Sequence, residues 1–298
     1  IVFLDAATMG DVSFAPIERY GSLVCYDSST AEEALERVSD CDVLIVNKVR
    51  VTPELIDAAP NLKLICESAT GVNNIDLEYA GSKGIPVRNA VGYSTSTVVQ
   101  ATFMHILSLV GHAPYYDRVV KDGSYSSSGM FTDVKVNWWE LSGKTIGIIG
   151  MGNIGSRVAR VAEAFGMKVC YCKDYPSLPL AQLLAESDVV SVHAPLNERT
   201  KGLIGKDELS MMQPHAYIVN MGRGGIIDES ALAYAVDNGV IAGAALDVFE
   251  VEPLPEDSCF LKVGHPERFR LAPHVAWASV EARERLVGMI ADNISKGW

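Results

Sequence analysis

Residues 145–155 read TIGIIGMGNIG, and this stretch decides the fold. Its first five residues form an apolar run that predicts a β-strand, and three glycines follow in the spacing GxGxxG. We expect Gly150 to permit a tight turn out of the strand, Gly152 to let the backbone approach a phosphate group, and Gly155 to let a helix pack closely on the strand. The stretch therefore predicts a dinucleotide site, with the pyrophosphate at the N-terminus of the helix.

The choice between NAD and NADP depends on the end of the next predicted strand, Lys168–Cys172. NAD sites place an acidic residue here that binds both ribose hydroxyls. In this chain the expected position holds Lys173, and the acid follows as Asp174. Asp174 could bind the ribose hydroxyls of NAD, whereas Lys173 could pair with the 2′-phosphate of NADP. Alternatively, both could be solvated charges in a loop. We favour NAD and leave NADP open.

Short β-branched runs alternate with helical patterns along the chain, which predicts an α/β fold of parallel sheets with crossover helices. The strands predicted in the first half are Ile1–Leu4, Val43–Val46, Leu62–Cys66 and Pro86–Asn89, with helices over Ala31–Val38 and Pro53–Ala58. Those predicted in the second half are Thr145–Gly150, Lys168–Cys172, Val189–His193, Tyr217–Met221, Ala242–Val248 and Phe269–Ala272. Six strands are the full complement of a dinucleotide-binding doubly wound sheet. A helix over Thr95–Val110 links the two series, and one over Ser279–Ser295 could cross back to the first domain.

The bulk composition narrows the function classes. A length of 298 residues suggests about two domains, and 48% hydrophobic residues can fill a substantial core. The formal net charge of −12 disfavours nucleic acid and membrane surfaces as partners. No apolar run approaches the roughly 20 residues that span a bilayer, and no signal peptide is apparent. Six cysteines without CxxC spacing are typical of reduced thiols in a cytoplasmic protein, and no cluster has metal-ligand spacing.

Three polar side chains follow successive predicted strands of the second series. Arg223 lies in NMGRGG (220–225), Glu252 in DVFEVEP (247–253) and His274 in APHVAW (272–277). Ligands of open parallel sheets bind beyond the carboxyl ends of the strands, so all three side chains should reach the same edge. Taken singly, each is also typical of a surface charge, a turn or an ordinary loop residue.

Together, the three side chains match the needs of 2-keto acid reduction. Arginine binds a carboxylate through its two-pronged donor geometry. Histidine titrates near neutral pH and can give a proton to the carbonyl oxygen as hydride reaches the carbon. A carboxylate beside the histidine favours the imidazolium and fixes the ring.

The sequence resembles the D-isomer-specific 2-hydroxyacid dehydrogenase family over nearly its whole length. The matching stretches are 69–74, 89–94, 150–155, 221–225, 247–253 and 273–279. The resemblance implies nicotinamide-dependent hydride transfer, with Arg223, Glu252 and His274 as the catalytic residues. It also implies a Rossmann-type cofactor domain over residues 94–278 and a flavodoxin-like substrate domain built from residues 1–93 and 279–298.

The same resemblance implies the ligand contacts. Backbone N–H groups around Thr70, Gly71 and Val72 would hold the substrate carboxylate, and Arg223 and His274 would also contact the substrate. Cofactor contacts are implied at Gly150, Gly152, Asn153, Ile154, Gly155, Lys173 or Asp174, Ala194, Pro195, Thr200, Met221, Gly222, Arg223, Asp247 and His274. The family is usually dimeric, with the Thr95–Val110 region at the interface.

Within the family, residues 4–6, 47–49, 69–74 and 277–279 are most similar to the glycerate dehydrogenases, or hydroxypyruvate reductases. Trp277 could form a wall of the substrate pocket or simply pack in the core. The rival interpretation is a dinucleotide-sensing corepressor on the same fold. It would need extra tails or a peptide groove, of which the sequence shows no sign, and a turnover assay with hydroxypyruvate separates the two.

Overall fold

The computed structural model describes residues 1–172 and 178–297, and the chain divides into two compact units. The first unit combines Ile1–Ser94 with the C-terminal residues from Ala278, and the second is Thr95–Trp277. Both contain an all-parallel sheet with helices, as the alternating sequence pattern predicts. No helix in the described ranges is both long and apolar enough to cross a bilayer.

The first unit contains a five-stranded sheet in the order β2-β1-β3-β4-β5, which is the flavodoxin-like order. Its strands are β1 (Val2–Phe3), β2 (Val24–Cys25), β3 (Val43–Val46), β4 (Leu64–Glu67) and β5 (Val87–Arg88). Every residue of β3 and β4 is buried, because both faces of these central strands are covered. The helices are α1 (Ala15–Glu18), α2 (Ala31–Arg37), α3 (Pro53–Asp57), α4 (Leu77–Ser82) and α12 (Val280–Ser295), with a 3-10 helix over Ala6–Met9.

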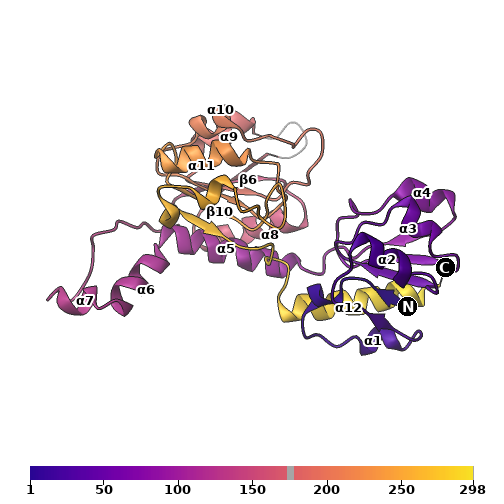
Figure 1. Cartoon of the computed structure of the whole chain (residues 1–298). Helices are drawn as coiled ribbons and strands as arrows, with labels where there is room; N and C mark the ends of the chain where they lie inside the picture. Colours follow the sequence, from indigo (N-terminus) through magenta and orange to yellow (C-terminus); the bar gives the residue numbers. More distant parts are fainter. Residues whose placement is uncertain (173–177, 298) are drawn as a thin grey trace. The chain divides into compact units, whose positions relative to one another are not determined.

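The C-terminal helix α12 is part of the first unit (Figure 1). Asn293 donates its side-chain amide to the carbonyl of Asn89 at 3.0 Å, and Arg285 donates to the carbonyl of Tyr93 at 2.9 Å. The helix begins with a side-chain cap from Ser279, which accepts the Ala282 N–H. These bonds tie the chain's last helix to its first 94 residues.

The second unit contains a six-stranded sheet in the order β11-β10-β9-β8-β6-β7. Its strands are β6 (Thr145–Ile149), β7 (Lys168–Cys172), β8 (Val189–Val192), β9 (Tyr217–Asn220), β10 (Gly243–Leu246) and β11 (Phe269–Leu271). Its helices are α5 (Thr95–Val110), α6 (Ala113–Lys121), α7 (Ser124–Ser127), α8 (Asn153–Ala164), α9 (Leu180–Glu186), α10 (Lys206–Met211) and α11 (Glu229–Asp237), with 3-10 turns at Cys259–Leu261 and Pro266–Arg268. Helices α5 and α8 cover one face of the sheet, and α9, α10 and α11 cover the other (Figure 1).

The strand order explains where a ligand can bind. The chain runs outward from β6 to β7 and then returns to place β8 on the other side of β6. This reversal is the switch point at which doubly wound sheets bind ligands. The number of strands is as predicted, but the classic 3-2-1-4-5-6 order has two strands beyond the first one. Only β7 occupies that side among the described residues.

Two features of the first half differ from the sequence prediction. The edge strand β2 was not predicted, because it has only two residues and both are exposed, so it lacks an apolar signature. It also carries Cys25, which is exposed, whereas Cys41 and Cys66 are buried as expected. All six cysteines are free.

Candidate active site

Four loops meet at the carboxyl edge of the second sheet through close backbone approaches. A Cβ atom on Gly150 would lie 2.6 Å from the Ala194 nitrogen, so the loops after β6 and β8 are in contact. A Cβ on Gly222 would lie 2.9 Å from the Ala194 carbonyl oxygen, and one on Gly224 only 1.8 Å from that of Phe249. The loops after β6, β8, β9 and β10 therefore form one continuous rim that larger residues would push apart.

The three glycines of residues 150–155 have distinct surroundings. Gly150 has a φ of +97°, a left-handed conformation that L side chains rarely adopt. A Cβ on Gly155 would lie 2.1 Å from the Gly150 carbonyl oxygen, so α8 packs directly on the turn. Gly152 immediately precedes α8, and a Cβ there would meet no atom of the described residues within 4 Å.

The N-terminus of α8 fits a dinucleotide phosphate. No described side chain caps this helix, which begins at Asn153. Its first N–H groups therefore point from a positive helix end into the open space beside Gly152. A pyrophosphate needs donors of this kind together with a close backbone approach, and both are present.

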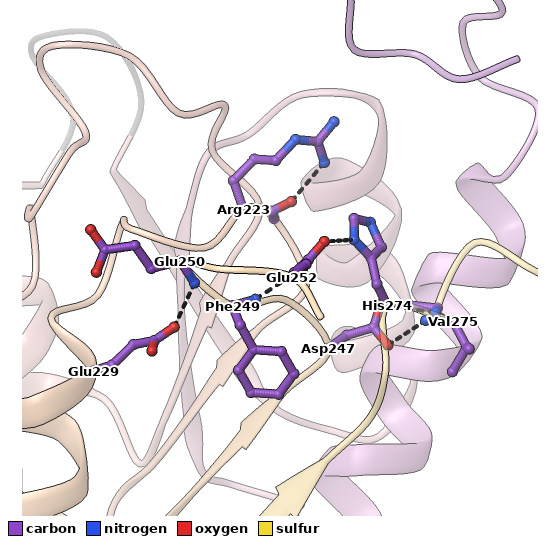
Figure 2. A network of polar contacts seen from close by, with 10 residues as sticks. Arg223, Glu229, Asp247, Phe249, Glu250, Glu252, His274 and Val275 are labelled. Carbon is purple, nitrogen blue, oxygen red and sulfur yellow. Dashed lines mark hydrogen bonds and ion pairs between the residues drawn. The ribbon is translucent and has the colours of Figure 1, made fainter. Parts of the chain in front are cut away.

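The loop after β9 holds Arg223 at the rim. Asn220, the last residue of β9, accepts the Gly222 N–H at 3.0 Å and donates to the Arg223 carbonyl at 2.9 Å. These two bonds fold the loop tightly, and the exposed Arg223 guanidinium turns back to the Gly222 carbonyl at 2.8 Å. Most of its donors thus face away from the loop, toward the space above the strands (Figure 2).

His274 and Glu252 form an ion-pairing contact. The Nδ1 atom of His274 lies 2.7 Å from Oε2 of Glu252, and the side chains are 24% and 30% exposed. The other oxygen of Glu252 accepts the Phe249 N–H at 3.0 Å, which fixes the carboxylate in its own loop. With Nδ1 occupied, Nε2 is the ring nitrogen that can meet a substrate, and Figure 2 shows the ring and the Arg223 side chain extending in the same direction.

Asp247 fixes the turn that carries His274. Its two carboxylate oxygens accept the N–H groups of Val275 at 2.8 Å and Ala276 at 2.9 Å. Burial raises the pKa of Asp247 above its usual range, and these two N–H bonds oppose that shift. His274 itself has a φ of +53°, an unusual conformation for a residue with a side chain, and Asp247 holds the two residues that follow it.

Sequence reasoning named Asp247 as a cofactor contact and did not foresee its hold on the His274 turn. It also missed Glu229 at the start of α11, whose Oε1 accepts the Glu250 N–H at 2.6 Å and so steadies the loop that carries Glu252 (Figure 2). Neither role has a sequence signal, because both join residues more than 20 positions apart through backbone N–H groups.

The remaining predicted contacts are distributed as follows. In the loop after β8, the Thr200 hydroxyl donates to the Pro195 carbonyl at 2.6 Å, which closes a turn beside Ala194. Met221 is buried next to Gly222, and Trp277 is partly exposed at the end of the second unit. Thr70, Gly71 and Val72 lie in the first unit, in the loop after β4. Lys173 and Asp174 lie outside the described residues.

Comparison with known proteins decides the family. The family model for the NAD binding domain of D-isomer specific 2-hydroxyacid dehydrogenases matches residues 103–276, more than half of the chain. The chain belongs to the D-isomer-specific 2-hydroxyacid dehydrogenase family. It is 39% identical over 279 residues to a glyoxylate reductase of Korarchaeum cryptofilum, covering 87% of this chain and 80% of that protein.

Two further matches cover nearly all of this chain. A hydroxypyruvate reductase of Blautia hydrogenotrophica is 33% identical over 311 residues, covering 99% of this chain and 96% of the relative. The crystal structure of D-lactate dehydrogenase from Aquifex aeolicus, complexed with NAD and lactic acid, has a TM-score of 0.83 and 28% identity, covering 99% and 94%. The chain is therefore a nicotinamide-dependent oxidoreductase of small 2-hydroxy acids and 2-keto acids, and the corepressor alternative has no support.

Proposed function

We propose that this dehydrogenase reduces hydroxypyruvate, or a 2-keto acid of similar size such as glyoxylate, with Arg223, Glu252 and His274 as the catalytic residues. The observation that carries the proposal is the 2.7 Å contact between His274 and Glu252 on the same rim as Arg223. The names of relatives that act on hydroxypyruvate and glyoxylate support the substrate class. The loop at Thr70–Val72 supplies the substrate carboxylate site of the first unit.

The nicotinamide, when bound, supplies the hydride. The protein's own residues bind the substrate's charged groups and transfer the proton. The Arg223 guanidinium binds the substrate's carboxylate and carbonyl oxygens. The imidazolium of His274 gives its Nε2 proton to the carbonyl oxygen, and the ionised Glu252 stabilises the positive ring before transfer. In the reverse direction the neutral His274 takes the proton of the substrate hydroxyl.

A turnover assay tests the proposed reaction. Hydroxypyruvate, glyoxylate and pyruvate are each mixed with NADH or NADPH, and the loss of reduced-nicotinamide absorbance is followed. We expect turnover of hydroxypyruvate, with NADH as the preferred cofactor. The absence of turnover with every keto acid and both cofactors would refute the proposed reaction.

The variant Arg223→Lys tests whether Arg223 binds the substrate carboxylate. Lysine keeps the positive charge but cannot form paired hydrogen bonds with a carboxylate. We expect kcat/KM for the keto acid to fall by roughly tenfold or more, since hydrogen bonds to charged groups contribute about 1.5–3 kcal/mol. The calorimetric affinity for the cofactor should change little. If the lysine variant matched the wild type, Arg223 would have no part in binding the substrate.

We also propose that the protein is a cytoplasmic homodimer. In the second unit, α6 and α7 extend beyond the sheet (Figure 1), and the segment that follows them exposes Phe131 by 89% and Val134 by 76%. Helix α5 exposes Met104 and Leu107 as well. Apolar surface of this kind suits a second copy of the chain, and six free cysteines suit a reducing compartment. Sedimentation analysis and cell fractionation test the two statements, and a monomeric or secreted protein would contradict them.

A further inference from the structure

Glu67 is a buried carboxyl group at the carboxyl end of β4, outside the catalytic trio. Its side chain has no exposed surface, and it lies opposite Val46 in the parallel register of β3 and β4. Its Oε2 atom accepts the side-chain amide of Asn74 at 2.9 Å. Its Oε1 atom is buried and has no hydrogen-bond partner among the described residues. A carboxylate with a single donor is an expensive group to bury.

The bond between Glu67 and Asn74 closes the base of the substrate loop, which we define as residues 69–74. Glu67 precedes the loop and Asn74 is its last residue, so the hydrogen bond between their side chains brings the two ends of the loop together. Asn74 also donates to the Val49 carbonyl at 3.1 Å and thereby joins the loop to the segment after β3. At its other end, Thr70 donates to the Ala90 carbonyl at 2.8 Å.

The segment after β3 is itself held by Asp5. The Asp5 carboxylate accepts the N–H groups of Asn47 at 2.9 Å, Lys48 at 2.6 Å and Val49 at 3.0 Å. Asp5 is thus well supplied with donors, whereas Glu67, at the same sheet edge, has one. The two carboxyl groups at this edge are in very different environments.

Burial favours the neutral form of Glu67. Burial raises the pKa of Glu67 to about 8; the negative Asp5 adds to this shift, while the Asn74 amide and the positive Lys48 oppose it. At neutral pH the group is therefore mostly a carboxylic acid, whose carbonyl oxygen can accept from Asn74. Above about pH 8 it becomes a buried anion beside Asp5.

We propose that Glu67 is a positioning residue for the substrate loop: in its protonated form, it closes the base of the loop through Asn74 and so fixes the backbone N–H groups that bind the substrate carboxylate. The inference rests on the proposed function of Thr70–Val72. Ionisation of Glu67 places an unbalanced charge under the loop, and loop and sheet must shift to solvate it. Substrate affinity should weaken as a result, while the second unit and its cofactor site are untouched.

Kinetics test the role of Glu67 in the loop. KM for hydroxypyruvate is measured from pH 6.5 to 9.5 at saturating cofactor in the wild type, Glu67→Gln and Glu67→Ala. Glutamine mimics the neutral acid, so Glu67→Gln should match the wild-type KM at neutral pH and exceed its affinity above pH 8. We expect the ratio of wild-type to glutamine KM to rise about fivefold, the scale of one hydrogen bond. Alanine, which cannot accept from Asn74, should raise KM at every pH, and Asn74→Ala should not add to it.

Stability measurements test the protonation itself without any turnover. The folded protein keeps a proton that the unfolded chain releases in the ordinary carboxyl range, so the wild type loses stability as pH rises from that range to about 8. Glu67→Gln has no such loss. Its Tm relative to wild type should therefore rise through this window and level off above it. Glu54→Gln, at an exposed carboxylate of α3, serves as the matched control and should show no such rise.

The outcomes are separable. A Tm difference between Glu67→Gln and the wild type that does not change with pH would overturn the claim that Glu67 is protonated in the folded protein. Parallel KM profiles for these two proteins, in an enzyme that does reduce hydroxypyruvate, would overturn the role in the substrate loop. If the wild type reduced no keto acid, the proposed function would be refuted, and the proposed role of the loop in binding substrate would be refuted with it.

Discussion

Replacing His274 by alanine should lower kcat for keto-acid reduction by roughly a hundredfold or more, the usual scale for a lost general acid. The Glu252 carboxylate holds the imidazole of His274, with Nδ1 of the ring 2.7 Å from Oε2. Asp247 holds the turn through the N–H groups of Val275 and Ala276, so the backbone should stay in place without the ring. The loss should therefore fall on the chemical step.

A second variant separates chemistry from backbone strain. The φ of +53° at His274 is better tolerated by asparagine than by alanine, and asparagine cannot carry a proton between pH 5 and 9. His274→Asn should keep the turn and lose kcat to a similar extent, with cofactor affinity unchanged by calorimetry. Substantial activity in both variants would mean that another group donates the proton.

Gly152→Val should abolish dinucleotide binding and leave the fold intact. A Cβ at this position meets no described atom within 4 Å, and its φ of −80° is one that any residue adopts. The added side chain would instead occupy the open space at the N-terminus of α8, where the pyrophosphate must approach. We expect the calorimetric Kd for both NADH and NADPH to rise by roughly a hundredfold or more, which is about 2.8 kcal/mol.

The same motif supplies a control for this variant. Gly155→Val places a side chain 2.1 Å from the Gly150 carbonyl oxygen, so it should lower Tm and reduce binding together. Gly152→Val should reduce binding with little change in Tm. Unchanged affinity for both cofactors in the Gly152 variant would remove this loop from the cofactor site.

Much of the second unit could be predicted because its signals are local. Strand β7 and helix α5 have the predicted bounds, and the strand–glycine–helix motif lies where its spacing placed it. Arg223, Glu252 and His274 lie at the same edge of the sheet because parallel strands carry the residues that follow them to that edge. The flavodoxin-like order of the first sheet likewise agrees with the family resemblance.

The contacts that complete the site could not be predicted, because they depend on residues distant in sequence. Asp247 accepts a hydrogen bond from Val275, 28 positions away. Glu67 ends a strand of apolar residues, and its hydrogen bond to the Asn74 side chain exists only in the folded structure. The edge strand β2 and the position of β7 depend on sheet assembly rather than on local pattern. Backbone N–H groups, which are identical in every residue except proline, make most of these contacts.

The pH dependence of kcat/KM in both directions tests the central claim that His274 and Glu252 move the proton. Reduction needs the imidazolium and should fall as pH rises, while oxidation of the hydroxy acid needs the neutral ring and should rise over the same range. In Glu252→Gln the ring loses the carboxylate that orients it and stabilises its positive charge, so kcat/KM for reduction should fall and its pH profile should differ from that of the wild type. A Glu252→Gln profile that coincides with the wild-type curve would contradict the claim.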